Sequence, residues 1–174
     1  TELALATELN DDQRRQLELV RSSADSLMHV LNDILDFSKI EAGKIELDPA
    51  AFDPREMIGD VLKMVGLRAH EKGIELTYRI RPDVPEVIIG DAGRIRQVLV
   101  NLVGNAIKFT DRGEVFVNVD VGGRSDGNIE LRFSVRDTGI GIDDAKQKAI
   151  FAAFTQADGS MTRRYGGTGL GLTI

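Results

Sequence analysis

Two asparagines and a lysine in one predicted helix form the first group of residues that could do chemistry. Asn101 and Asn105 are four residues apart and Lys108 follows one turn later, so all three side chains share a helical face. Amide oxygens suit Mg²⁺, which keeps most of its water ligands and shares phosphate oxygens, and a lysine offers phosphate a point charge. The spacing indicates a magnesium and phosphate site, although the same spacing also describes a solvated polar face.

A carboxylate beside two glycines forms the second group. In "RDTGIGI", Asp137 ends a predicted strand, and Gly139 and Gly141 permit a tight turn with close backbone approach. A carboxylate at such a strand end can accept a hydrogen bond from an exocyclic amine such as that of adenine. The D-x-G-x-G pattern alone is weak, because many turns share it.

The last fifth of the sequence combines aromatic, basic and glycine residues. Phe151 and Phe154 are three apart, which suits either a core pair at a helix end or anchors for the segment behind them. In "RRYGGTGLGL", Arg163 and Arg164 could reach a terminal phosphate, and free amides at the start of a following helix attract anions. The stretch has neither the P-loop spacing nor a G-x-G-x-x-G fingerprint.

The N-terminal part has a helical rhythm. Asn10 and Gln13 predict a capping box, and Gly43 predicts the helix stop, so the helix should run from Asn10 to about Ala42. A short helix over Glu2 to Ala6 could be the tail of its partner. A helix packed on its own domain is the alternative, but a sustained apolar seam favours a helical hairpin that dimerises. The seam consists of Leu17, Val20, Ala24, Leu27, Leu31 and Ile34.

The remaining chain alternates between strand and helix patterns. We expect an α+β fold in which an α/β sandwich, one mixed sheet with helices on one face, follows the hairpin. The expected elements are a strand in "KIELDPAAF", a helix from Pro54 to about Lys72, a strand "IELTYRI", a helix capped by Asp91 through Phe109, strands "GEVFVNVDV" and "NIELRFSVRD" joined by the loop "GGRSDGN", and a helix over Asp143 to Phe151.

Composition excludes several classes of protein. The chain has 174 residues, 42% hydrophobic and 29% charged, as in ordinary soluble globular proteins. A net charge of −6 leaves no general basic surface for nucleic acid. The absence of cysteine excludes disulfides and thiolate metal sites and fits a reducing compartment. No apolar run approaches the roughly 20 residues that span a bilayer, so we expect a soluble segment without membrane contact.

The order of these motifs is more specific than any one of them. N-x-x-x-N, D-x-G-x-G, F-x-x-F and G-x-G-x-G follow one another between Asn101 and Gly171, which resembles the N, G1, F and G2 boxes of sensor histidine kinases. "NDILDFSKIEAGKIEL" resembles the end of the second dimerisation helix, especially in hybrid-type kinases. The resemblance covers essentially the whole chain. It implies a partial dimerisation and phosphoacceptor hairpin over residues 1–45 and a Bergerat-type ATP-binding catalytic domain over 46–174 that looks truncated at its C-terminus.

The resemblance also implies roles for individual residues in binding ATP and Mg²⁺. Asn105 would coordinate Mg²⁺ with Asn101 beside it, and Lys108 would lie at the phosphates. Asp137 would read adenine in a pocket shaped by Gly139 and Gly141. The lid would be bounded by Phe151 and Phe154 and would close over the triphosphate through Gly167, Gly169 and Gly171, with Tyr165, Thr168 and Leu170 also binding the cofactor and Arg163 or Arg164 neutralising charge.

The implied activity is transfer of the ATP γ-phosphoryl group to a histidine, for relay to an aspartate of a response-regulator receiver domain. The implied partners are a second copy, bound through the hairpin, and an upstream sensor domain. The family's S-H-E-[IL]-R-T-P-L box is missing here, and the only histidines, His29 and His70, lack its context. We interpret both as structural or surface residues, and expect a fragment of a longer kinase that cannot phosphorylate itself.

Two other functional classes remain open. ATPases of the gyrase, mismatch-repair and chaperone type resemble this fold but place a glutamate four residues before the metal-binding asparagine. That position is Asn101 here, and an amide cannot take a proton from water. The second alternative is a nucleotide-binding scaffold without catalysis, against which the intact set of four boxes argues.

Overall fold

The structure, a computed structural model, describes residues 2–147, 149–152, 169 and 171–173. The chain divides into two compact units, Thr1–Ile45 and Glu46–Thr173. Each unit is described by itself.

The first unit contains two helices, α1 (Glu2–Leu5) and α2 (Asp11–Glu41), which contact each other. The predicted capping box is confirmed: Gln13 N–H donates to Asn10 Oδ1 at 2.8 Å, and Asn10 N–H donates to Gln13 Oε1 at 3.1 Å. At the other end, Gly43 has φ +62°, the left-handed conformation that ends many helices. Local chemistry therefore sets both ends of α2.

The apolar seam of α2 is largely exposed within this single chain. Leu27 is 69% exposed, and Val20, Leu31 and Ile34 are also exposed. The apolar surface is wider than the predicted seam, since it also includes the exposed Leu19, Met28 and Leu35.

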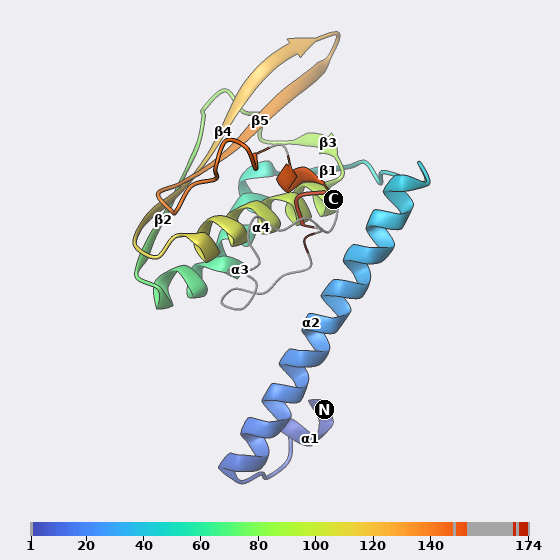
Figure 1. The fold of residues 1–174 in the computed structure, drawn as a ribbon. Coiled ribbons are helices and arrows are strands. Elements are labelled where there is room, and N and C mark those ends of the chain that lie inside the picture. Colours follow the sequence, from blue (N-terminus) through green and yellow to red (C-terminus); the bar gives the residue numbers. More distant parts are fainter. Residues whose placement is uncertain (1, 148, 153–168, 170, 174) are drawn as a thin grey trace. The chain divides into compact units, whose positions relative to one another are not determined.

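The second unit is an α+β fold whose helices α3 and α4 cover one side of a sheet (Figure 1). The sheet has the order β2-β4-β5, with β2 parallel and β5 antiparallel to β4, so the expected mixed sheet is confirmed. The expectation of a single sheet is wrong, because β1 and β3 form a separate antiparallel pair. The elements are β1 (Ala50–Phe52), α3 (Pro54–Glu71), β2 (Ile74–Ile80), β3 (Ile88–Gly90), α4 (Ala92–Phe109), β4 (Gly113–Ser125), β5 (Asn128–Asp137) and a short 3₁₀ helix (Ala149–Phe151).

Side-chain caps start both long helices of this unit. Asp53 Oδ1 accepts from Arg55 N–H at 2.7 Å, and Pro54 occupies the first turn of α3, where a missing N–H costs nothing. Asp91 Oδ1 accepts from Arg94 N–H at 2.9 Å at the start of α4. These bonds, to Arg94 first and then to Asp48 N–H, lower the pKa of Asp91.

The core lies between the helices and the inward face of the sheet. Val115, Val117 and Val119 alternate along β4 and are at most 1% exposed. They pack with buried residues of α3 and α4, namely Met57, Ile58, Val61, Leu62, Val65, Ala69, Leu99, Val103, Ala106 and Ile107. The packing therefore fixes the apolar face of α4 against the sheet, and the opposite face of the helix remains available for other contacts.

Three predicted elements differ from the structure. Only Ala50–Phe52 of "KIELDPAAF" is a strand, which fits the presence of Pro49, whose nitrogen cannot donate to a ladder. The loop "GGRSDGN" is mostly strand, because Asp126 and Gly127 both have positive φ and make a two-residue turn. Of the predicted helix Asp143 to Phe151, the described residues form a turn at 144–147 and the 3₁₀ helix, and a helix this short is marginal in water.

No helix in the described part of the chain is long and apolar enough to cross a membrane.

Candidate functional site

The polar face of α4 is presented because its opposite face is held in the core. Leu99 and Val103 are at most 2% exposed, whereas Asn101, Asn105 and Lys108 are only partly buried. The predicted sharing of one helical face by these three side chains follows from the regular helix through Phe109.

Partial burial changes the chemistry of Lys108. Desolvation lowers the pKa of its ammonium group, and the nitrogen lies 5.0 Å from the centroid of the Phe109 ring. An ammonium that has already lost part of its water attracts an anion more strongly than a fully solvated one. Lys108 is therefore suited to a phosphate group.

The turn that carries Asp137 is anchored at both ends. Asp137 Oδ1 accepts from Gly139 N–H at 2.9 Å, and Thr138 Oγ1 accepts from Glu114 N–H at 3.0 Å. The Asp137 side chain is exposed, and its second oxygen, Oδ2, can accept a hydrogen bond from a ligand. The local bonds thus orient a carboxylate that faces solvent.

This turn rests directly on the end of α4. Ile140 N–H donates to Phe109 O at 3.3 Å. A Cβ at Gly139 would lie 2.5 Å from the same oxygen, so the expected close backbone approach is present there. At Gly141 glycine is favoured for a different reason, because the φ angle there is +70°. The Phe109 carbonyl is therefore the point at which the C-terminal end of α4 and the Asp137 turn meet.

The described glycines near the C-terminus also reach α4. Asn101 Nδ2 donates to Gly171 O at 3.2 Å, and the amide carbon lies 3.6 Å from the position of a Cβ on Gly171. Gly169 has φ +72°. Two motifs separated by 70 positions in the chain are thus in contact.

Phe151 is 61% exposed, which argues against a core position for it, and its carbonyl accepts from Thr173 Oγ1 at 3.4 Å. The other predicted site residues lie outside the described residues: Phe154, Arg163, Arg164, Tyr165, Gly167, Thr168 and Leu170.

Sequence reasoning missed two residues that shape the site. Thr138 ties the turn to β4 as given above, and Lys72 Nζ binds three carbonyl oxygens at the end of α4. A lysine near a helix end is a recognised cap for its own helix, but nothing local in the sequence indicates that Lys72 caps a different helix.

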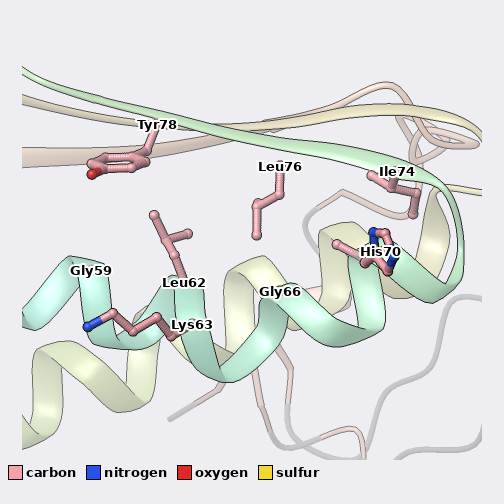
Figure 2. Close-up of a pocket in the computed structure, with 9 residues that line it drawn as sticks. Gly59, Leu62, Lys63, Gly66, His70, Ile74, Leu76 and Tyr78 are labelled. Atoms are coloured by element: carbon pink, nitrogen blue, oxygen red, sulfur yellow. The ribbon is translucent and has the colours of Figure 1, made fainter.

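A separate hollow of about 480 Å³ lies between α3 and β2 (Figure 2). Leu62, Ile74 and Leu76 give it apolar walls, while His70 and Tyr78 add polar groups. No predicted site residue lines it, so the α4 site is a different place. His70 is exposed there, as expected for a surface residue.

The side chains of the α4 site could hold Mg²⁺ only if water and phosphate oxygens supplied most of its ligands. Among the described residues, no three His, Cys, Asp or Glu side chains lie close enough to hold a metal. Mg²⁺ commonly takes one or two protein oxygens and completes its shell with water and phosphate oxygens. An asparagine oxygen from Asn105 is compatible with that arrangement.

Similar proteins are known along the whole length of the chain. Residues 90–174 match the family described as "Histidine kinase-, DNA gyrase B-, and HSP90-like ATPase", and residues 1–43 match "His Kinase A (phospho-acceptor) domain". The signal transduction histidine-protein kinase BarA of Escherichia coli (strain K12) is 46% identical over 174 residues, covering 100% of this chain and 19% of BarA. The hybrid signal transduction histidine kinase L of Dictyostelium discoideum is 43% identical, covering 99% of this chain and 10% of that protein.

Among solved structures, full-length ShkA in complex with AMPPNP matches with a TM-score of 0.76 and 38% identity, covering 97% of this chain and 34% of ShkA. The chain spans about a fifth or less of the length of the two curated relatives named above. The C-terminal match includes three kinds of ATPase, and the N-terminal match and the relatives along the whole chain single out one of them: the chain belongs to the sensor histidine kinases.

Proposed function

We propose that residues 46–174 bind MgATP and transfer its γ-phosphoryl group to a histidine, and that residues 1–45 are part of a dimerisation and phosphoacceptor hairpin without the acceptor box. The observation that carries the proposal is the contact of the Asp137 turn with the Phe109 carbonyl at the C-terminal end of α4, the helix that bears Asn101, Asn105 and Lys108. That contact holds an amide and ammonium face and an exposed carboxylate on adjoining elements.

Each described residue has a role suited to its surroundings. Asp137 Oδ2 would accept a hydrogen bond from the adenine amine, because Oδ1 is already bound to Gly139 N–H. Asn105 would hold Mg²⁺ together with phosphate oxygens, and Lys108 would bind phosphate charge. The bound metal would supply charge neutralisation at the phosphates, the main requirement of phosphoryl transfer. Arg163 and Arg164 are proposed to assist at the terminal phosphate.

The partners follow from the family and from α2. The exposed apolar residues of α2 suit a second copy of the hairpin, as in a helical bundle. We propose a cytoplasmic location, a receiver domain as the destination of the phosphoryl group, and an upstream sensor domain. The AMPPNP bound to ShkA supports ATP as the nucleotide here.

Calorimetry with MgAMPPNP tests nucleotide binding. Asp137→Asn should weaken binding about tenfold or more, because the purine amine loses a charged acceptor. Asp126→Asn, which makes the same charge change in the β4–β5 turn, is the matched control and should leave affinity unchanged. Equal affinities for MgATP and MgGTP would contradict the adenine assignment.

Labelled ATP tests the chemistry. The chain alone should gain no acid-labile, base-stable label, since it has no acceptor box. A separate acceptor hairpin that carries the box should become labelled, and Asn105→Ala should abolish that labelling. Label on His29 or His70 would show that the acceptor argument is wrong. Rapid phosphate release without any acceptor would favour an ATPase.

A further inference from the structure

The C-terminal end of α4 lacks a glycine cap. An α-helix leaves its last carbonyl groups without partners in the helix. Thr110 N–H donates to Ala106 O at 3.0 Å and closes the last turn, but Thr110 itself is extended, with φ −99° and ψ 120°. Neither Thr110 nor Asp111 has a positive φ, so the helix has no left-handed cap and the carbonyls beyond Ala106 need donors from elsewhere.

Lys72 supplies those donors from the end of α3. Its Nζ lies 2.8 Å from Ile107 O, 2.9 Å from Lys108 O and 2.8 Å from Thr110 O. An ammonium group has three N–H donors, and three carbonyls meet them. The positive charge also lies at the negative end of the helix dipole. Lys72 thus does for α4 what a C-terminal cap does.

The backbone of Lys72 is itself well held. Lys72 is the C-cap of α3, and its N–H donates to Arg68 O at 3.3 Å. The next residue, Gly73, has φ +67° and leads into β2, which pairs with β4 from Ile74 onward. The ammonium is therefore fixed to the junction of a packed helix and a paired strand, not to a loop.

The carbonyl of Phe109, between those of Lys108 and Thr110, is bound by the Asp137 turn instead. Phe109 O accepts from Ile140 N–H at 3.3 Å, and Gly139 lies against the same oxygen. Consecutive carbonyls are thus held by two elements: Lys72 takes those of Ile107 and Lys108, and the turn takes that of Phe109. If the C-terminal end of α4 moved, the Phe109 carbonyl that binds the turn would move with it.

We propose that Lys72 is a positioning residue that keeps the end of α4 in register with the Asp137 turn. In doing so it sets the separation between Asn105 and Lys108 on one side and Asp137 on the other. The inference rests on the proposed function, because that separation matters to a nucleotide only if both sides bind it. Lys72 would act through backbone oxygens, because three carbonyls already take the three donors of its ammonium group.

Amide hydrogen exchange in the 174-residue chain tests the structural half without any nucleotide. Lys72→Met keeps the side-chain stem and removes the donors, and should speed exchange of the Ile140 amide about tenfold. Lys63→Met is the matched control on α3, because the Lys63 ammonium pairs with Asp60, at 3.1 Å, on an exposed surface. It should leave Ile140 unchanged. If Lys72→Met does not fold, Lys72→Gln, neutral and with two donors, takes its place with the same expected direction.

A double-mutant cycle tests the positioning half by calorimetry with MgAMPPNP. Lys72→Met should weaken binding about tenfold in the wild-type background but only about twofold when Asp137 is already Asn, because misplacing the turn then matters less. A lysine that only stabilises the fold would give the same factor in both backgrounds.

Each outcome decides one point. Wild-type exchange at Ile140 in Lys72→Met would overturn the hold on the turn, and equal factors in the cycle would overturn the positioning role. If no form of the chain, wild type included, bound nucleotide, the proposed function would fail instead. The exchange result would then still decide whether Lys72 holds the turn.

Discussion

Adding one methyl group at Gly139 tests the contact on which the candidate site depends. The φ of Gly139 is not in the left-handed region, so alanine is acceptable to the backbone there. The obstacle is space: the new Cβ would lie 2.5 Å from Phe109 O and 2.9 Å from its carbonyl carbon, and both atoms belong to the backbone of α4. Neither neighbour can rotate away as a side chain would.

The expected cost follows from the required movement. The Cβ must retreat by about 0.9 Å to reach an ordinary contact of 3.4 Å. Such a shift would stretch the Ile140 N–H to Phe109 O bond, already 3.3 Å long, beyond hydrogen-bonding range. Overpacking costs about 1–3 kcal/mol and the lost bond about 1 kcal/mol, so Gly139→Ala should lower the free energy of unfolding by about 2–4 kcal/mol.

The assay must report on this unit and not on α2. Urea-dependent hydrogen exchange of the Val117 and Val119 amides does so, because both residues are buried in β4. Gly66→Ala is the matched control: it makes the same change within α3, where a Cβ would meet nothing within 4 Å, and should stabilise by about 1 kcal/mol. If Gly139→Ala unfolds at the wild-type urea concentration, the close approach does not constrain the turn and the argument for the site is wrong.

Three further predictions concern other parts of the chain. Thr110 is 0% exposed and its hydroxyl has no hydrogen-bond partner in the described structure, so Thr110→Val should raise the free energy of unfolding by about 1 kcal/mol in the same exchange assay. Asp91 has a lowered pKa, so its carboxylate contributes its full stabilisation at pH values above the pKa of an unfolded aspartate. The stability gap between wild type and Asp91→Ala in thermal unfolding should therefore close as the pH falls through that lowered pKa. Leu27, 69% exposed on α2, should be needed for association, and Leu27→Asp should give monomers by light scattering where the wild type gives dimers.

The sequence predicts best what is decided within a few residues. Asn10, Asp53 and Asp91 each accept a backbone N–H two or three positions ahead, so the starts of α2, α3 and α4 depend on short-range chemistry. The β4–β5 turn belongs to the same class, since Asp126 followed by Gly127 is a strong signal for a two-residue hairpin. The predicted loop is longer than this turn because it includes the Gly122–Gly123 pair, where the strand only bulges.

Contacts between distant residues could not be predicted in this way. The order of the motifs predicts that α4, the Asp137 turn and the glycines near the C-terminus share a site, but not which atoms touch. Lys72 caps a helix through carbonyls that lie 35 to 38 residues further along the chain. Gly139 owes its identity to a carbonyl of α4 and not to its own dihedral angles. Such contacts depend on how the sheet and helices pack, which no local pattern encodes.

Asn101 shows why one residue type can serve both structure and chemistry at this site. Its Nδ2 donates to Gly171 O at 3.2 Å, and only a side chain with an N–H or O–H can make that bond. An ionised glutamate at this position would place negative oxygens against the carbonyl of Gly171 and repel it. The amide therefore ties α4 to the glycine stretch, and it also leaves this position without a group that could take a proton from water. A site built in this way retains the bond to its glycines and gives up the base that hydrolysis would need, which favours transfer of the phosphoryl group to another acceptor.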